Sequence, residues 1–250
     1  MAPLGLADWY LVAAALPVGS FVGVVIDRLP AEDNVFTGRS RCEHCGHALS
    51  AVDLVPLASW LATLGRCRYC RAWLGWFYPG VEVTALVIAL LSLAVDRGAE
   101  AWVDAALGWW LLALAWIDWR DLILPDALTL PLILFGLAVG GALQPEGLAD
   151  LVGGVVCGYL VLWAIGWAYR RLRGREGLGM GDAKLLAAAG AWVGASGLPS
   201  VLFGAAFVTL LAAGGMMLAG HRVDRHTALP FGPFLALAMW LVWLFGPITY

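Results

Sequence analysis

The sequence predicts an all-α polytopic membrane protein of about eight transmembrane helices with one small soluble insert. Hydrophobic residues make up 62% of the 250 residues, and the mean hydropathy is +0.82. Only 13% of the residues are charged, whereas a soluble globular domain has about 25%. Lipid is therefore the expected surrounding of most of the chain. The net charge of −3 is small and does not suggest a nucleic-acid partner.

Apolar segments of nearly membrane-spanning length recur along the chain, because a helix needs about 20 residues to cross the hydrocarbon core. They are Leu6–Ile26, Tyr78–Val95, Ala101–Ile117, Leu122–Leu143, Leu148–Ala168, Ala183–Ala195, Ser200–Gly220 and Ala228–Pro247. The segment 183–195 is too short to cross alone. It either begins below the membrane surface or forms a kinked pair with the next segment around Gly197, Leu198 and Pro199. We expect a first transmembrane helix in residues 1–27, a soluble insert in 28–77 and a membrane core of about seven helices in 78–250.

Basic residues indicate how these helices are oriented. If each segment crosses the membrane in turn, one side holds the connections 28–77, 118–121, 169–182 and 221–227. Of the 15 Lys and Arg residues, all except Arg97 then fall on that side or, for Lys184, just inside the membrane beside it. Cytoplasmic connections carry an excess of Lys and Arg, so we predict that this side faces the cytoplasm.

Four of the five cysteines lie in the insert, as the pairs Cys42-x-x-Cys45 and Cys67-x-x-Cys70. Two such pairs separated by about 20 residues can supply four thiolates to one tetrahedral zinc ion. A cytoplasmic location disfavours disulfides, and a metal would stabilise a segment that has few apolar residues. We therefore predict a small, cytoplasmic, zinc-binding insert with Cys42, Cys45, Cys67 and Cys70 as the ligands. The alternative is a set of free or redox-active thiols.

Asp118 and Asp182 stand at the cytoplasmic ends of two predicted membrane helices, far apart in the sequence but at the same depth. Ionisable groups in such segments are costly, and they are usually functional. Two carboxylates brought together share one proton, because like charges at close range cannot easily both ionise. The ionised carboxylate can then activate water while the protonated one polarises a carbonyl group. We predict that Asp118 and Asp182 form a catalytic pair.

The sequence around the second aspartate is Gly179-Met180-Gly181-Asp182-Ala183-Lys184. Gly179 and Gly181 lack side chains, so an extended peptide substrate can approach this segment and pair with it. We predict Gly179, Gly181 and Lys184 as substrate-binding residues. The alternative for Asp182 is a helix cap without a catalytic role, and the same explanation accounts well for Asp126.

Taken together, the motifs resemble those of the type IV prepilin leader peptidases, a family of bacterial membrane aspartyl proteases. The resemblance covers nearly the whole chain. The segments that carry it are Val18–Phe21 with Arg28–Pro30, the two CxxC pairs with Ser59–Leu61 and Gly65–Cys67, Pro79 with Glu82 and Thr84, Ile117–Pro131, Gly179–Leu186 and Leu229–Ala236. Residues 179–182 match the GxGD motif that this family shares with presenilin-like proteases.

The resemblance implies that Asp118 and Asp182 occupy the positions of the two catalytic aspartates. The implied substrate is a type IV prepilin or a type II secretion pseudopilin, whose basic leader is cut at the cytoplasmic face of the inner membrane. The same family enzyme then methylates the new N-terminal amine with S-adenosylmethionine. A presenilin-like protease, a proton-coupled membrane transporter and a non-enzymatic membrane scaffold remain alternatives. Transporters often have internal repeats and midplane carboxylates, and the sequence suggests neither.

Overall fold

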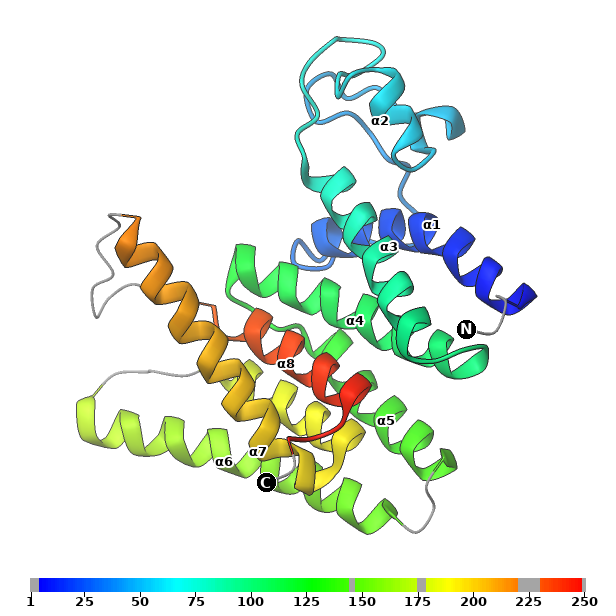
Figure 1. The fold of residues 1–250 in the computed structure, drawn as a ribbon. Helices are drawn as coiled ribbons and strands as arrows, with labels where there is room; N and C mark the ends of the chain where they lie inside the picture. Colours follow the sequence, from blue (N-terminus) through cyan, green and yellow to red (C-terminus); the bar gives the residue numbers. More distant parts are fainter. Residues whose placement is uncertain (1–4, 144–146, 175–178, 220–229, 249–250) are drawn as a thin grey trace. The chain divides into compact units, whose positions relative to one another are not determined.

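The computed structural model describes residues 5–143, 147–174, 179–219 and 230–248, and within these ranges the chain is helical without a named strand (Figure 1). Six of the helices are long and apolar enough to cross a membrane, and α8 is a shorter apolar helix. The predicted all-helical, multi-pass membrane fold is therefore confirmed. The helices are α1 (Leu6–Arg28), the 3₁₀ helix η1 (Ala51–Leu54), α2 (Ala58–Ala62), α3 (Phe77–Val95), α4 (Ala99–Asp121), α5 (Asp126–Leu143), α6 (Leu148–Arg173), α7 (Met180–Leu218) and α8 (Gly232–Phe245).

The helix ends differ from the hydropathy-based expectation on the side predicted to be cytoplasmic. Helix α4 continues through Asp121, so Asp118 lies inside the helix rather than in a connection. Helix α6 continues through Arg173 and ends at Gly174, whose φ of 68° is left-handed. Arginines in the last turn of α6 interact favourably with the negative end of the helix dipole. The helix therefore continues into charged residues beyond the end of its apolar segment. The rest of the connection, 175–178, lies outside the described residues, as does the predicted basic connection 221–227.

Helix α7 contains both of the segments that the sequence separated, 183–195 and 200–220. Its backbone leaves the helical conformation at Gly194, where φ is 71° and ψ is 174°. Pro199 follows one turn later, and its missing N–H removes the hydrogen bond that the carbonyl of Ala195 would otherwise accept. The two parts of α7 run in different directions (Figure 1, yellow and orange). The kinked-pair alternative is confirmed, with the break at Gly194, just before the predicted Gly197, Leu198 and Pro199.

The described residues group into two compact units, 1–113 and 114–250, and α4 runs from the first unit into the second. In the first unit, α1 packs closely on α3. A Cβ atom on Gly19 would lie 2.8 Å from the Cβ of Ala85, and one on Gly23 would lie 2.8 Å from the ring of Tyr78. The hydroxyl of Tyr78 donates a hydrogen bond to Asp27 at 2.7 Å. Small residues on α1 therefore fix the beginning of α3, where the soluble insert rejoins the membrane helices.

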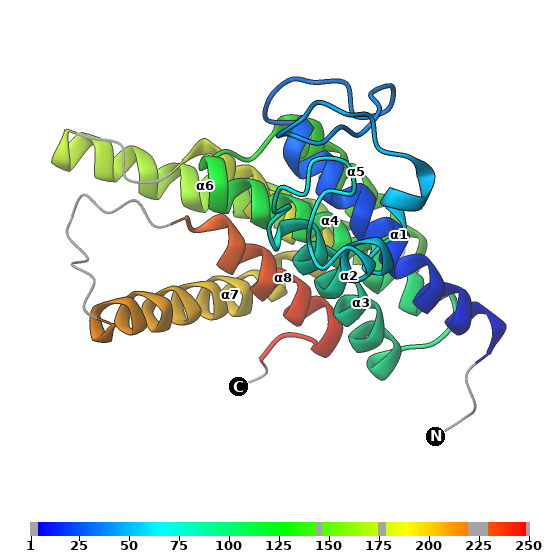
Figure 2. The same ribbon diagram turned by 90° about the horizontal axis from the view of Figure 1, so that it is seen from above.

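In the second unit, α6 and α7 pack with their backbones nearly in contact. A Cβ atom on Gly154 would lie 2.5 Å from the carbonyl oxygen of Gly190, and one on Gly158 would lie 2.5 Å from that of Leu186. Small residues are the usual means by which membrane helices approach so closely. Helix α8 packs along α7 as well (Figures 1 and 2). This packing fixes the N-terminal part of α7, which carries Asp182.

Candidate active site and metal centre

Asp118 and Asp182 line a single cavity of about 280 Å³ in the second unit. Asp118 comes from the last turns of α4 and Asp182 from the first turn of α7, and their charges interact. The remaining walls belong to the turn between α4 and α5 and to the start of α7; the lining residues there are Leu122, Ile123, Leu124, Gly179, Met180, Gly181 and Lys184. The fold therefore brings together two carboxylates that are separated by more than sixty positions in the sequence.

The carboxylate of Asp118 is held by the N-terminus of α8. The backbone N–H of Gly232 donates a hydrogen bond to its Oδ2 atom at 3.0 Å, and Asp118 is only 6% exposed. A Cβ atom on Gly232 would lie 2.6 Å from Oδ2, so only glycine leaves room for this contact. The positive end of the helix dipole adds to the attraction for a carboxylate. Sequence reasoning did not identify Gly232, although the Phe231-Gly232-Pro233 string at a helix start was the available signal.

Asp182 accepts a hydrogen bond from the backbone N–H of Gly179, the residue that precedes α7. This is the contact that a capping carboxylate makes three residues into a helix. The same carboxyl group faces the cavity that Asp118 lines. Asp182 can therefore cap α7 and also lie beside Asp118. The capping explanation does not remove Asp182 from the candidate site.

The thiols of Cys42, Cys45, Cys67 and Cys70 form a second cluster, in the first unit, with all four sulfur atoms within 4.8 Å of one another. The sulfurs of Cys42 and Cys70 are 3.9 Å apart. Four zinc–sulfur bonds of about 2.3 Å in a tetrahedron place the sulfurs about 3.8 Å from one another. The donor set and its geometry thus fit a tetrahedral metal ion, as the sequence predicted.

The two cysteine pairs lie in knuckles of the same shape. In each knuckle the N–H of the first cysteine donates across the turn, from Cys42 to His47 at 3.0 Å and from Cys67 to Ala72 at 2.8 Å. One isolated β-bridge closes each turn, Arg41 with Ala48 and Arg66 with Trp73. Backbone hydrogen bonding from Cys70 lowers the pKa of the Cys67 thiol to about 7, whereas burial and the neighbouring thiols raise the pKa of the Cys70 thiol to about 11. A metal ion that binds the four sulfurs displaces the remaining protons.

Known proteins of similar sequence decide the family. Residues 13–95 match the Bacterial Peptidase A24 N-terminal domain, and residues 105–214 match the Type IV leader peptidase family. A prepilin leader peptidase/N-methyltransferase of Aeromonas hydrophila is 41% identical, over 93% of this chain and 88% of its own length. The chain belongs to the type IV leader peptidase family.

Other relatives of this family agree. Proteins of the same description from Stutzerimonas stutzeri and Pseudomonas aeruginosa are 37% and 36% identical, each over 92% of this chain and 88% of the relative. No solved structure matches the chain significantly. Membership in a peptidase family does not favour the transporter and scaffold alternatives.

The two glycines of the GxGD motif have different surroundings. A Cβ atom on Gly181 would lie 2.9 Å from the Cβ of Leu124, so this glycine allows the α4–α5 turn to pack against α7. Leu122 begins that turn with a left-handed φ of 55°, which directs the chain back toward α7. Among the described residues, the nearest atom to a Cβ position on Gly179, apart from its chain neighbours, is Oδ2 of Asp182 at 3.5 Å. Within the described part of the chain, Gly179 is thus less closely packed than Gly181.

Lys184 lines the cavity and forms an ion pair with Asp126, with 2.5 Å between Nζ and Oδ1. Asp126 is the first residue of α5, where an acidic side chain suits the helix dipole. The pair joins the start of α5 to the start of α7. It therefore holds together the two helices that flank the α4–α5 turn.

Proposed function

We propose that this chain is a membrane aspartyl endopeptidase that removes the basic leader from type IV prepilins or type II secretion pseudopilins. The observation that carries the proposal is the single cavity lined by Asp118 and Asp182. Family membership supports the substrate class, as do relatives that are named as prepilin leader peptidases.

In the proposed mechanism Asp118 and Asp182 share one proton and act as a unit. The ionised carboxylate takes a proton from a water molecule, and the oxygen of that water attacks the carbonyl carbon of the scissile peptide. The protonated carboxyl group donates a hydrogen bond to the carbonyl oxygen. As the carbon–nitrogen bond breaks, the leaving amine takes up a proton from the pair. Gly232 N–H keeps Asp118 oriented throughout, because it bonds Oδ2 at 3.0 Å.

We place the cut site on the cytoplasmic side of the bacterial inner membrane. Asp118 lies near the C-terminal end of α4, and Asp182 lies in the first turn of α7. Arg120 follows Asp118 in the same last turn of α4, and Arg170, Arg171 and Arg173 occupy the last turn of α6. Basic residues mark the cytoplasmic ends of membrane helices, so these ends are assigned to the cytoplasm. Membrane lipid then surrounds the apolar outer faces of the helices.

Zinc is the metal proposed for the four thiols, because a tetrahedral set of four sulfurs in a reducing compartment is typical of structural zinc. The ion would bind Cys42, Cys45, Cys67 and Cys70 and hold the two knuckles together. We assign the ion a structural role, because four thiol ligands complete a tetrahedral shell and leave no open position for a substrate.

We further propose that the enzyme methylates the amine that cleavage exposes, as the names of its relatives state for those proteins. S-adenosylmethionine, when bound, supplies a methyl group on a positively charged sulfur. The new N-terminal amine would take this methyl group and lose a proton, while the sulfur would keep the electron pair of the broken carbon–sulfur bond.

A mass measurement on a prepilin tests both reactions. Detergent-purified, zinc-loaded protein is mixed with a prepilin, with and without S-adenosylmethionine, and the product is weighed by mass spectrometry. We expect loss of the leader in both samples and one additional methyl group only where the donor is present. Absence of cleavage for every prepilin and pseudopilin tried would contradict the proposed activity.

A further inference from the structure

The rim of the aspartate cavity has an acidic part on the last turn of α4. Asp121 is the final residue of α4 and lies three positions beyond Asp118. The backbone N–H of Leu122 donates to the carbonyl oxygen of Asp118 at 3.0 Å, so the hydrogen bonding of the helix continues through this turn. Residues three and four positions apart are neighbours on one face of a helix. Asp121 and Leu122 therefore lie next to Asp118, on the side of α4 that Asp118 presents to the cavity.

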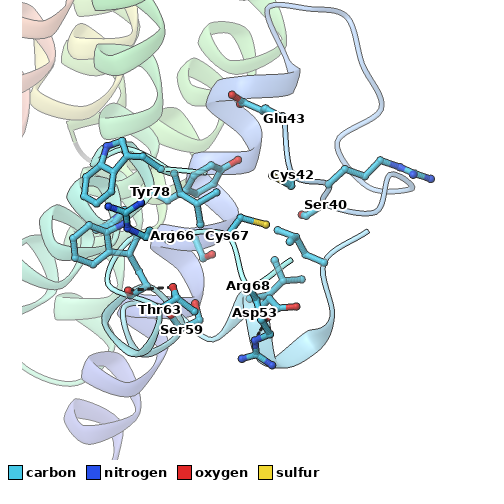
Figure 3. A pocket seen from close by; sticks show the side chains of 18 of the residues that line it. Ser40, Cys42, Glu43, Asp53, Ser59, Thr63, Arg66, Cys67, Arg68 and Tyr78 are labelled. Atoms are coloured by element: carbon cyan, nitrogen blue, oxygen red, sulfur yellow. Dashed lines mark hydrogen bonds and ion pairs between the residues drawn. The ribbon is translucent and has the colours of Figure 1, made fainter. Parts of the chain in front are cut away.

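Asp121 is exposed and takes part in none of the ion pairs among the described residues. Asp53 in the first unit differs, since it is paired with Arg68 with 3.1 Å between Oδ1 and Nε, as Figure 3 shows. Arg120 does not compensate Asp121 in this way, because adjacent residues of a helix do not face each other. The negative end of the helix dipole also lies here, which disfavours a carboxylate and favours a cation. A cationic ligand would thus be attracted by both the side chain and the helix end.

The charges inside the cavity do not oppose a cation. Its ionisable lining residues are Asp118, Asp182 and Lys184. The two aspartates share one proton in the proposed mechanism and so keep one negative charge. The ammonium group of Lys184 is already bound by Asp126, with 2.5 Å between Nζ and Oδ1. The described charges at the cavity are therefore negative in sum, and they favour a basic peptide over an acidic one.

Apolar side chains form the other part of the rim. Leu122, Ile123 and Met180 line the cavity and are 53%, 45% and 46% exposed. The next residue of the turn, Leu124, is buried, and its Cβ lies 2.9 Å from a Cβ position on Gly181. This contact anchors the α4–α5 turn to the start of α7. The turn therefore presents two apolar side chains at a fixed place beside the aspartates, where an apolar stretch of a substrate would remove them from water.

We infer that the two parts of the rim fix the direction in which a prepilin crosses the catalytic pair. Asp121 binds the basic side chains of the leader, and the apolar rim of Leu122, Ile123 and Met180 takes the first apolar residues of the mature pilin. Such a substrate is basic before the cut and apolar after it, so only one direction satisfies both parts. The opposite direction would place basic side chains on the apolar rim and lose their pairing with a carboxylate. The inference rests on the proposed function and adds the residues that recognise the substrate.

Cleavage kinetics with reversed charges test the acidic part of the rim. Full-length, zinc-loaded protein in detergent is given a prepilin with its basic leader or one with glutamate in place of each basic leader residue. We expect Asp121→Lys to raise KM for the basic leader roughly tenfold with little change in kcat, because an exposed attraction becomes a repulsion of similar size. The same variant should have a lower KM for the acidic leader than the unmutated protein has.

Glu32→Lys is the matched control for this charge reversal. Glu32 is an exposed glutamate of the first unit and lines neither cavity, so the variant should leave both KM values unchanged. Zinc content and the midpoint of thermal unfolding are measured on each variant to show that it is folded. If the ratio of the two KM values in Asp121→Lys equals that of the unmutated protein, the inference is overturned while the peptidase assignment stands. Absence of cleavage by the unmutated protein would instead refute the proposed function.

Photo-crosslinking tests both parts of the rim and does not depend on the folding of Asp121→Lys. A benzophenone amino acid is placed at position 121 or 123 in protein that carries Asp182→Asn, so that bound prepilin stays uncleaved. We expect the probe at 121 to react with the leader and the probe at 123 to react with the first residues of the mature pilin, as seen by peptide mapping. The reverse assignment, or reaction of both probes with lipid alone, would overturn the inference.

Discussion

The backbone N–H of Gly232 donates a hydrogen bond to Oδ2 of Asp118 at 3.0 Å, and so the start of α8 orients one of the two candidate catalytic aspartates. The residues are more than a hundred positions apart in the sequence. No side chain on Gly232 takes part, and a Cβ atom there would lie 2.6 Å from the same oxygen. The position of Asp118 thus depends on the close approach of α8 as well as on its own helix.

Substitution of Gly232 by alanine should displace the Asp118 carboxylate. We expect kcat for prepilin cleavage to fall roughly 10- to 100-fold with a smaller change in KM, because small misplacements of catalytic groups have effects of this size. Steady-state kinetics on a prepilin peptide measures both constants. Gly214→Ala is the control, because no atom of the described residues lies within 4 Å of a Cβ position on Gly214. Equal kinetics for the two variants would show that Gly232 does not position Asp118.

The close packing of α6 on α7 predicts a stability effect at Gly154. A Cβ atom there would lie 2.5 Å from the carbonyl oxygen of Gly190, and rigid backbone cannot readily move away. We expect Gly154→Ala to destabilise the protein by about 1–3 kcal/mol, seen as a lower midpoint of thermal unfolding in detergent. In the part of the chain that the structure describes, no atom lies within 4 Å of a Cβ position on the adjacent Gly153, so Gly153→Ala should leave the midpoint nearly unchanged.

Metal analysis tests the thiol cluster. We expect one zinc ion per chain in gently purified protein and its loss in Cys67→Ser, because Cys67 is one of four sulfurs within 4.8 Å of one another. Cys157 stands outside the cluster on α6, so Cys157→Ser should keep the full metal content. A strong chelator should also lower the unfolding midpoint, since the ion stabilises the insert. Unmutated protein without zinc, although folded and active, would contradict a structural metal.

A pair of variants separates two roles of Lys184. If its Nζ atom also contacts the substrate, Lys184→Met should raise KM for prepilin by up to about tenfold, the effect of one lost charged hydrogen bond. Asp126→Asn removes only the ion pair of 2.5 Å, whose two side chains are 28% and 57% exposed, and should change KM little. Identical kinetic changes in both variants would mean that Lys184 acts only by joining α5 to α7.

Hydropathy and charge predicted most of the membrane architecture, because long apolar runs have few alternatives in lipid. Every described membrane helix overlaps one of the predicted segments. The ends were less predictable, since α6 continues into Arg170–Arg173, where arginine stabilises a helix end that hydropathy treats as a connection. The break in α7 was expected around Gly197, Leu198 and Pro199 but occurs at Gly194, because the hydrogen bond that a proline cannot donate is lost in the turn before it.

The part of the candidate site that consists of reactive side chains was predictable from the sequence. Asp118 and Asp182 were placed together because alternate spans bring both to one membrane face. Gly232 was not predicted, because its contribution is a backbone N–H, which every residue type except proline possesses. Gly181 shows a related limit: the sequence suggested room for substrate, whereas its immediate neighbour is Leu124. Such contacts depend on how distant segments pack together, and this packing cannot be deduced from a single sequence.

The most direct test of the central claim, that Asp118 and Asp182 act as one catalytic pair, is a cleavage cycle with Asp118→Asn, Asp182→Asn and the double variant. Prepilin cleavage rates are compared with that of the unmutated protein. We expect each single variant to lose roughly a thousandfold or more in rate and the double variant to lose little beyond that, because residues that act as a unit have non-additive effects. A single variant that cleaves at nearly the normal rate would contradict the account. Losses that multiply in the double variant would show that the two aspartates act independently.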